Sequence, residues 1–266
     1  MRFEMWAALL GLAVILPALP AGAVATERVL AFHSDVRVAP DGTLAVTETI
    51  EIQGEGKPVP GGGLLREFPA RYRDRAGNSV ALPLEVLKVT RNGRTEPYSI
   101  ERSSGGTRIR VRDGDVLPRG KHLYAIAYRT GRQVTFYDRY DEVYWNVTGG
   151  AWRATFDRLS AEVSFAEPVA AGSLVAEALT GADGTRGQDY NAFVRQGSAA
   201  FRATRPLKPG EGMVVVVAFP KGVVAPPPLS ARASATARLV IVLLLFLSLA
   251  AAWRRWGGTS VSGLKP

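Results

Sequence analysis

Apolar and polar residues alternate with a period of two over most of residues 26–222. In residues 30–38, for example, Leu30 and Phe32 share one face with two valines, and His33 lies on the other. Such alternation predicts β-strands with one buried face. Asp-Gly and Asn-Gly pairs, which favour tight turns, separate several of these segments. The pattern therefore predicts an all-β domain.

The expected strands are short and closely spaced. They fall at residues 30–38, 44–52, 84–90, 95–100, 107–112, 122–129, 134–137, 143–147, 161–165, 199–204 and 213–219. Many short alternating strands joined by glycine, proline, asparagine and aspartate turns favour a β-sandwich. We expect one such sandwich or two sub-sandwiches. Strand 122–129 has apolar residues on both faces, among them Leu123, and is expected at the centre of a sheet.

Two longer apolar segments flank this domain. Residues 1–25 combine Arg2, an apolar run and an Ala-Val-Ala ending, which is the pattern of a secretory signal peptide. Residues 239–253 carry no charge, and extending this run back to residue 233 gives the ~20 residues needed to cross a bilayer. Two arginines follow the run directly, so the positive-inside rule places its C-terminal side in the cytoplasm.

These segments predict the organisation of the whole chain. We expect a signal peptide (1–25), an extracytoplasmic β-sandwich domain (26–222), a proline-rich linker (223–232), a single C-terminal transmembrane helix (233–253) and a short cytoplasmic tail (254–266). This order predicts a single-pass protein of the bacterial inner membrane, with the N-terminal domain outside the cytoplasm.

Composition narrows the chemistry. The chain has no cysteine and only two histidines, which excludes disulfides and thiolate nucleophiles and leaves little material for metal sites, so no cofactor or metal is expected. The formal net charge is +9, and residues 57–132 hold 16 basic against 7 acidic side chains. Because the domain is expected outside the cytoplasm, the predicted partners are the inner membrane, other envelope proteins, and anionic envelope polymers or lipid headgroups, not nucleic acid.

The clearest basic pattern lies in residues 107–112. Arg108, Arg110 and Arg112 fall on one face of this expected strand, and apolar residues fall on the other. A solvated strand face explains this pattern, and so does a binding surface for an anionic partner. We call these three residues the basic stripe.

Glu48 is out of place in the pattern of residues 44–52. Alternation directs its carboxylate into the apolar face, where a charge is costly unless it is paired. Arg66, which follows a glycine run, is the expected partner, because a guanidinium can bind both carboxylate oxygens and stays charged. We hypothesise a partly buried Glu48–Arg66 pair that fixes a glycine loop to the first hairpin. The alternative is a β-bulge that turns Glu48 into solvent.

Catalytic patterns are weak throughout the sequence. His33-Ser34-Asp35 contains the residue types of a hydrolase triad, but adjacent strand residues point to opposite faces. Carboxylates that could support hydrolysis or transfer chemistry are Glu48, Asp138, Asp141 and Glu142. Spacing singles out no pair among them, so no catalytic residue is assigned.

Several segments resemble one known family. They are DGTLAVTETIEI (41–52), GGGLLREFP (61–69), DEVYWNVTGGAW (141–152) and RPLKPGEGMVVVVAFPKGVV (205–224). Their order and spacing are similar to those of the YciQ-type predicted membrane proteins, whose extracytoplasmic part is domain of unknown function (DUF) 2207. The resemblance implies a signal peptide, a β-rich domain and then membrane helices. Because this family has no established enzymatic activity, the resemblance indicates location and fold and does not indicate a reaction.

The sequence therefore predicts a non-enzymatic, membrane-anchored interaction module of the bacterial envelope. The alternative is a carboxylate-based hydrolase or transferase that acts on an envelope polymer. Two carboxylates facing each other in a deep cleft would favour the enzyme, and dispersed acids would favour the module.

Overall fold

A computed structural model describes residues 28–56, 64–73, 79–111, 116–149, 152, 154–182 and 185–226. The predicted signal peptide, transmembrane helix and cytoplasmic tail lie outside these ranges, as does most of the predicted linker. Within the described ranges, no helix has the length and apolar character needed to span a membrane.

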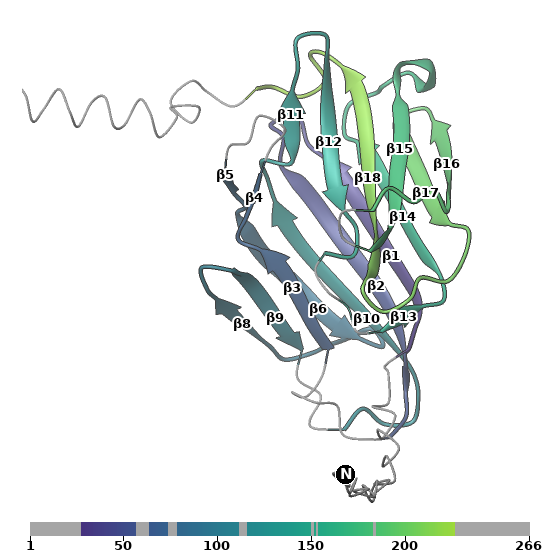
Figure 1. The fold of residues 1–266 in the computed structure, drawn as a ribbon. Helices are drawn as coiled ribbons and strands as arrows, with labels where there is room; N and C mark the ends of the chain where they lie inside the picture. The colour runs from purple at the N-terminus through teal and green to yellow at the C-terminus, as the bar shows by residue number, and fades with distance from the viewer. Residues whose placement is uncertain are drawn as a thin grey trace, which may run out of the picture.

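The described chain is nearly all β-strand (Figure 1). The strands are β1 (Arg28–Val38), β2 (Leu44–Gly54), β3 (Leu64–Pro69), β4 (Arg71–Arg73), β5 (Ser79–Ala81), β6 (Leu84–Arg91), β7 (Arg94–Thr95), β8 (Tyr98–Arg102), β9 (Gly106–Val111), β10 (Gly120–Thr130), β11 (Val134–Phe136), β12 (Tyr140–Asn146), β13 (Thr155–Phe156), β14 (Leu159–Phe165), β15 (Val175–Ala182), β16 (Tyr190–Arg195), β17 (Ser198–Ala203) and β18 (Glu211–Pro220). One short 3-10 helix covers Ala171–Ser173. The predicted all-β class is confirmed.

A nine-stranded sheet forms the base of the domain. Its order is β16-β17-β14-β1-β2-β10-β6-β7, and β13 also pairs with β1. Strand β1 runs antiparallel to β2 and parallel to β14, with Phe32 opposite both Ile50 and Leu159. The first strand therefore joins the two halves of the chain into one sheet.

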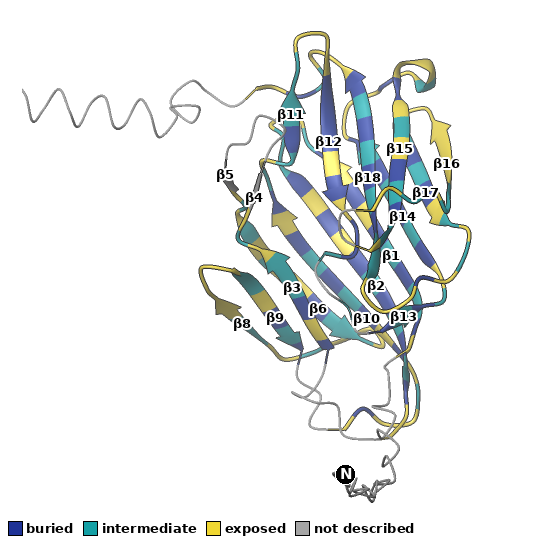
Figure 2. Cartoon of the chain, viewed as in Figure 1, coloured by how far each residue is buried: buried dark blue, intermediate teal, exposed yellow. Residues whose placement is uncertain are grey.

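A four-stranded sheet, in the order β11-β12-β18-β15, lies against one face of this base (Figure 1). The rings of Phe165 on β14 and Phe219 on β18 are 4.7 Å apart. The Trp145 indole on β12 donates a hydrogen bond of 3.1 Å to Ser34 Oγ on β1. Figure 2 shows the alternation of buried and exposed residues along the large sheet, which places the core between the two sheets.

A three-stranded sheet, β3-β9-β8, extends the same core. Its inward side chains Leu64, Ile109 and Val111 are buried. The ring of Phe68 on β3 packs edge-on against Tyr128 on β10 at 5.0 Å. Strand β3 is thus held between its partner β9 and the large sheet.

Four local expectations need correction. A register shift between Val29 and Ala31 places Val29, not Leu30, in the core. Strand β10 is central, but its second face is open, and Leu123 is 46% exposed. The segment after the glycine run, which is absent from the expected strands, is a strand, because Leu64–Pro69 pairs along its whole length with β9. The single strand expected over 95–100 is two strands, β7 and β8, in different sheets.

Candidate functional site: a buried ion pair beside an apolar cavity

Glu48 lies in the middle of β2 and is fully buried. No bulge turns it outward, because β2 stays in register with β1 and β10 on either side of it. An isolated carboxylate in such surroundings would lose its hydration without compensation. The surrounding strands must therefore supply hydrogen-bond donors.

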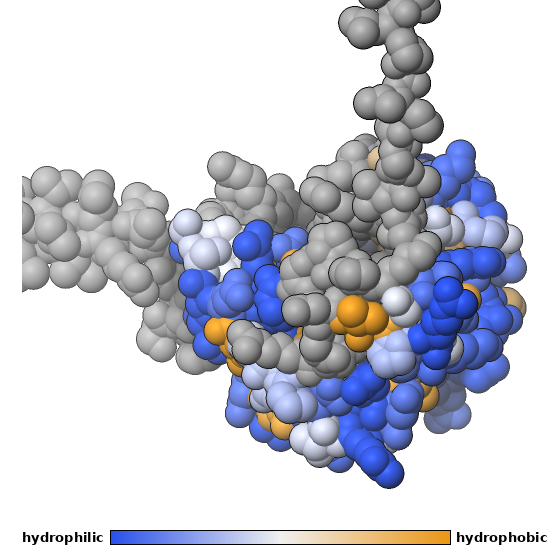
Figure 3. All heavy atoms as spheres, turned by 90° about the horizontal axis from the view of Figure 1, so that it is seen from below, coloured by the Kyte–Doolittle hydropathy of each residue, from blue (hydrophilic) through white to orange (hydrophobic). Residues whose placement is uncertain are grey.

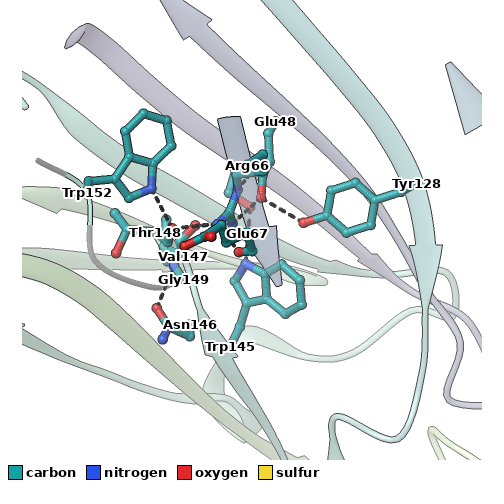
Figure 4. Close-up of polar contacts among 11 residues, drawn as sticks. Glu48, Arg66, Glu67, Tyr128, Trp145, Asn146, Val147, Thr148, Gly149 and Trp152 are labelled. Carbon is teal, nitrogen blue, oxygen red and sulfur yellow. Dashed lines mark hydrogen bonds and ion pairs between the residues drawn. The ribbon is translucent and has the colours of Figure 1, made fainter. Parts of the chain in front are cut away.

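Arg66 on β3 supplies two of these donors, and the Glu48 and Arg66 side chains meet head-on (Figure 4). Arg66 Nε donates to Glu48 Oε2 and Arg66 Nη2 donates to Oε1, both at 2.7 Å. Arg66 is itself only 1% exposed. The contact is the bidentate, charge-assisted type that gives both geometry and strength.

The remaining guanidinium hydrogens bind backbone carbonyls. Arg66 Nη1 donates to Thr148 O at 2.6 Å and to Glu67 O at 3.0 Å, and Nη2 lies 3.4 Å from Val147 O. The central carbon of the guanidinium, Arg66 Cζ, lies over the Phe68 ring, 4.4 Å from the ring centre. One side chain therefore ties β2 of the large sheet, β3 of the small sheet and the segment after β12 to one another.

Tyr128 on β10 completes the coordination of Glu48. Its hydroxyl donates to Glu48 Oε1 at 2.7 Å. Burial, followed by the charge of Glu48, raises the pKa of Tyr128 well above its ordinary value, so the phenol stays protonated as a donor. Burial acts to lower the pKa of Arg66, but the charge and hydrogen bonds of Glu48 outweigh it, and the pKa of Arg66 is raised.

The turn after β12 is shaped to receive Arg66. Gly149 has φ +68°, and a Cβ atom at this position would collide with Arg66 Nη1. Its N–H donates to Asn146 Oδ1 at 2.9 Å, and the Trp152 indole donates to Thr148 O at 2.8 Å. These two hydrogen bonds hold the turn in the conformation that accepts the guanidinium. Glu48, Arg66, Tyr128 and Gly149 are called the buried cluster below.

An apolar cavity of about 130 Å³ adjoins the buried cluster. Its walls include four aromatic residues and two amides, which are Phe68, Tyr128, Tyr144, Trp145, Gln133 and Asn146. Phe68 and Tyr128 also contact Arg66 and Glu48, so the cluster fixes one wall of the cavity. Tyr144 lines the cavity and is 39% exposed, so part of this wall is accessible from solvent.

The basic stripe lies on the outer face of β9. Arg108 is exposed and pairs with Glu67 at 2.6 Å, while Arg110 lies 3.6 Å from Glu101. Arg112 falls outside the described residues. Each described arginine of the stripe thus faces a carboxylate of a neighbouring strand, which lowers the local positive charge.

The candidate carboxylates lie in different environments. Asp138 is exposed in the turn between β11 and β12, whereas Asp141 is buried and accepts a 2.5 Å hydrogen bond from Lys221 Nζ. Glu142 is buried on β12. Glu48 lies in the buried cluster. Among the described residues, no group of three or more histidines, aspartates or glutamates has the arrangement of a metal site.

The residues of the triad-like sequence point apart, as adjacent strand residues should. His33 Nδ1 lies 2.9 Å from Ser160 Oγ on the open face of the large sheet. Ser34 is buried on the other face and accepts the hydrogen bond from Trp145.

Sequence reasoning missed half of the buried cluster. Tyr128 falls in the expected strand 122–129, but its alternation predicts only a core position, and Gly149 gives no signal beyond its residue type. The carbonyls of Val147 and Thr148 have no signature in a sequence. The closest available signal was Tyr128 itself, because a buried tyrosine hydroxyl requires a partner.

The solved structures to which this chain is similar are distant from it. Yeast LTA4 hydrolase in complex with bestatin is 12% identical, with a TM-score of 0.47 over 71% of this chain and 28% of the other. An M1 zinc metallopeptidase from Deinococcus radiodurans is 12% identical, with a TM-score of 0.38 over 72% of this chain and 42% of the other. Likenesses of this size carry no argument about activity.

Comparisons of the amino-acid sequence are more informative, because they identify a family. The "Uncharacterized protein YciQ" of Escherichia coli (strain K12) is 29% identical over 127 residues, which are 47% of this chain and 20% of that protein. The chain thus spans about a fifth of the length of that relative. Residues 28–219 match the family described as "Predicted membrane protein (DUF2207) N-terminal domain". The chain belongs to this family of predicted membrane proteins, and the match covers almost the whole described domain.

Proposed function

We propose that this chain is a non-enzymatic binding module anchored in the bacterial inner membrane. Residues 26–222 form a β-sandwich outside the cytoplasm, and residues 233–253 form the single membrane span. Membership of a predicted membrane protein family supports the location. The charge-free run in residues 239–253 and the two arginines after it support the anchor and its direction.

The apolar cavity beside the buried cluster carries the binding part of the proposal. Its walls hold four aromatic rings and the amides of Gln133 and Asn146, a composition typical of sites that accept one apolar group and orient it by a few polar contacts. The Arg66 and Tyr128 contacts make the wall rigid before any partner arrives. A rigid site loses less conformational entropy on binding. The proposed partner is another envelope protein that inserts one apolar side chain.

The state of the carboxylates favours binding over hydrolysis. Glu48 is held by Arg66 and Tyr128, and Asp141 by Lys221. A general acid or nucleophile must be free to reach a substrate. A hydrolase that used Glu48 or Asp141 would require one of these contacts to open.

Photocrosslinking in living cells tests the binding site. A photoreactive amino acid in place of Tyr144, an exposed residue that lines the cavity, is expected to capture a discrete envelope protein. The same substitution at Leu123, which is similarly exposed on the open sheet face, is the control. Replacing Thr107, which lines the cavity, with Trp should fill the space and abolish capture from position 144. Equal capture at both positions would contradict the assignment of the cavity as the binding site.

A further inference from the structure

The chain does not leave the domain freely after β18. Lys221 Nζ donates to Asp141 Oδ1 at 2.5 Å and to Tyr137 O at 2.7 Å, which ties it to the turn between β11 and β12. The N–H of Ala225 donates to Pro40 O at 2.7 Å, in the turn between β1 and β2. Val224 is 2% exposed. Residues 221–226 are therefore a strap held against two turns, and the chain leaves the domain at a fixed place.

The turn beside this strap presents an aromatic pair. The rings of Tyr137 and Tyr140 are 4.9 Å apart, and Tyr140 is 38% exposed. Arg139 next to it is exposed as well. Figure 1 shows this turn projecting beyond the strands at the top of the domain, on the side where the described chain ends. Tyrosine and arginine at such a tip match the preference of amphipathic side chains for a membrane–water interface.

The sequence limits the distance between this turn and the predicted membrane span. Six residues, 227–232, separate Pro226 from the start of the span at Ala233. A fully extended chain reaches at most ~3.3–3.6 Å per residue, so the strap ends within ~25 Å of the span. By contrast, β2 begins beside the strap, and its far end lies about ten residues along the strand, or ~33 Å, from there. Figure 3 looks at the domain from below, where the visible described surface is mainly hydrophilic.

We propose that the turn Tyr137–Tyr140 docks into the headgroup region of the membrane that the C-terminal segment enters. This inference rests on the proposed membrane span. The exposed charges around the strap are mixed, because Arg139 follows Asp138 in the turn, and Lys221 and Glu167 line the same hollow beside the strap. The tip therefore binds through the exposed Tyr140 and not through net charge. Docking at this point holds the domain in one orientation on the bilayer, and it leaves the far end of β2 away from the lipid.

The absence of cysteine makes a direct test practical, because a single introduced cysteine labels one position. The full chain is reconstituted in phosphatidylcholine liposomes that contain headgroup spin-labelled lipid. An environment-sensitive fluorophore is attached at Asp138→Cys, in the turn, or at Glu55→Cys, exposed beyond the far end of β2. We expect several-fold stronger quenching at position 138 than at position 55. The difference should persist in ~1 M salt, where the Debye length is ~3 Å.

A second variant isolates the tyrosine. Tyr140→Ser, added to the Asp138→Cys chain, should reduce quenching at position 138 by at least half. Tyr98→Ser, which changes a tyrosine of similar exposure on β8, should leave it unchanged. Equal quenching at positions 138 and 55 in chains that resist alkaline extraction would overturn the docking and leave the anchor intact. Extraction of the chain from the liposomes at alkaline pH would overturn the membrane span and the docking together.

Discussion

The buried cluster and the basic stripe each contain an arginine–glutamate ion pair, but in opposite surroundings. Arg66 and Glu48 are 1% and 0% exposed in their side chains and meet through two 2.7 Å contacts. Arg108 and Glu67 are 57% and 41% exposed, although their 2.6 Å contact is just as short. Removing one partner of a buried pair leaves a charge that water cannot reach, whereas a surface charge is rehydrated at once. Distance alone therefore does not measure what an ion pair contributes.

Removing Arg66 should have the largest effect. Arg66→Met strands the Glu48 carboxylate in the core and removes the hydrogen bonds to the carbonyls of Thr148 and Glu67. We expect a loss of ~3–5 kcal/mol in the free energy of unfolding. Denaturant titration of the full chain in detergent measures it, because Trp145 and Trp152 report on this region by fluorescence.

A double-mutant cycle sharpens this prediction. Adding Glu48→Gln to Arg66→Met removes the stranded charge, so the double variant should be less destabilised than the sum of the two single variants. Additive losses would show that the two side chains contribute independently, against the geometry of the pair.

Gly149→Ala should have the next largest effect. A side chain at φ +68° costs ~1–2 kcal/mol, and displacing the Arg66 guanidinium adds overpacking strain of ~1–3 kcal/mol. Gly197→Ala is the matched control, since Gly197 has φ +71° and open space around its Cβ position. The difference between the two variants in unfolding free energy isolates the collision with Arg66. Equal losses would contradict a role for Gly149 in receiving this side chain.

Tyr128→Phe should cost ~1.5–3 kcal/mol, because it removes a hydrogen bond to a charged acceptor. It should also change the pH dependence. The pKa of Tyr128 is raised in the folded state, so its contribution to stability is complete below the unfolded value of ~10 and is lost as pH rises beyond it. The wild-type chain should therefore lose stability above pH ~10 more steeply than the variant. The same titration measures the unfolding free energy of both chains between pH 9 and 11. An equal loss in the wild-type chain and in Tyr128→Phe would argue against a buried phenol.

The basic stripe should give the smallest change in stability. Arg108→Gln, Arg110→Gln and Arg112→Gln together are expected to alter the unfolding free energy by ~0–1 kcal/mol per pair. Their predicted effect is on adhesion. In low-salt vesicle flotation, the full chain with the three substitutions should bind anionic vesicles more weakly than the wild-type chain does. The control replaces three exposed arginines elsewhere, Arg94, Arg195 and Arg202. Equal binding by the two triple variants would mean that the stripe is only a solvated strand face.

The sequence by itself determined the class of the fold and the need for a buried partner. Alternation identified most strands, because side chains of a strand point to opposite faces in strict order. It also placed Glu48 inside and Arg108 outside without any coordinates. Arg66 followed from chemistry, since few side chains can neutralise a carboxylate in a core and remain charged.

The tertiary structure alone decided which groups complete the cluster and which strands meet. Pairing β1 in parallel with β14 joins residues more than a hundred positions apart, and local alternation is the same for every possible neighbour. The same long-range packing brings Tyr128, the carbonyl of Thr148 and Gly149 to Arg66. A backbone carbonyl exists at every position, so only the folded chain selects the one that a guanidinium binds. The exposure of Leu123 could not be predicted for the same reason, because strand composition does not reveal whether a second layer covers that face of the sheet.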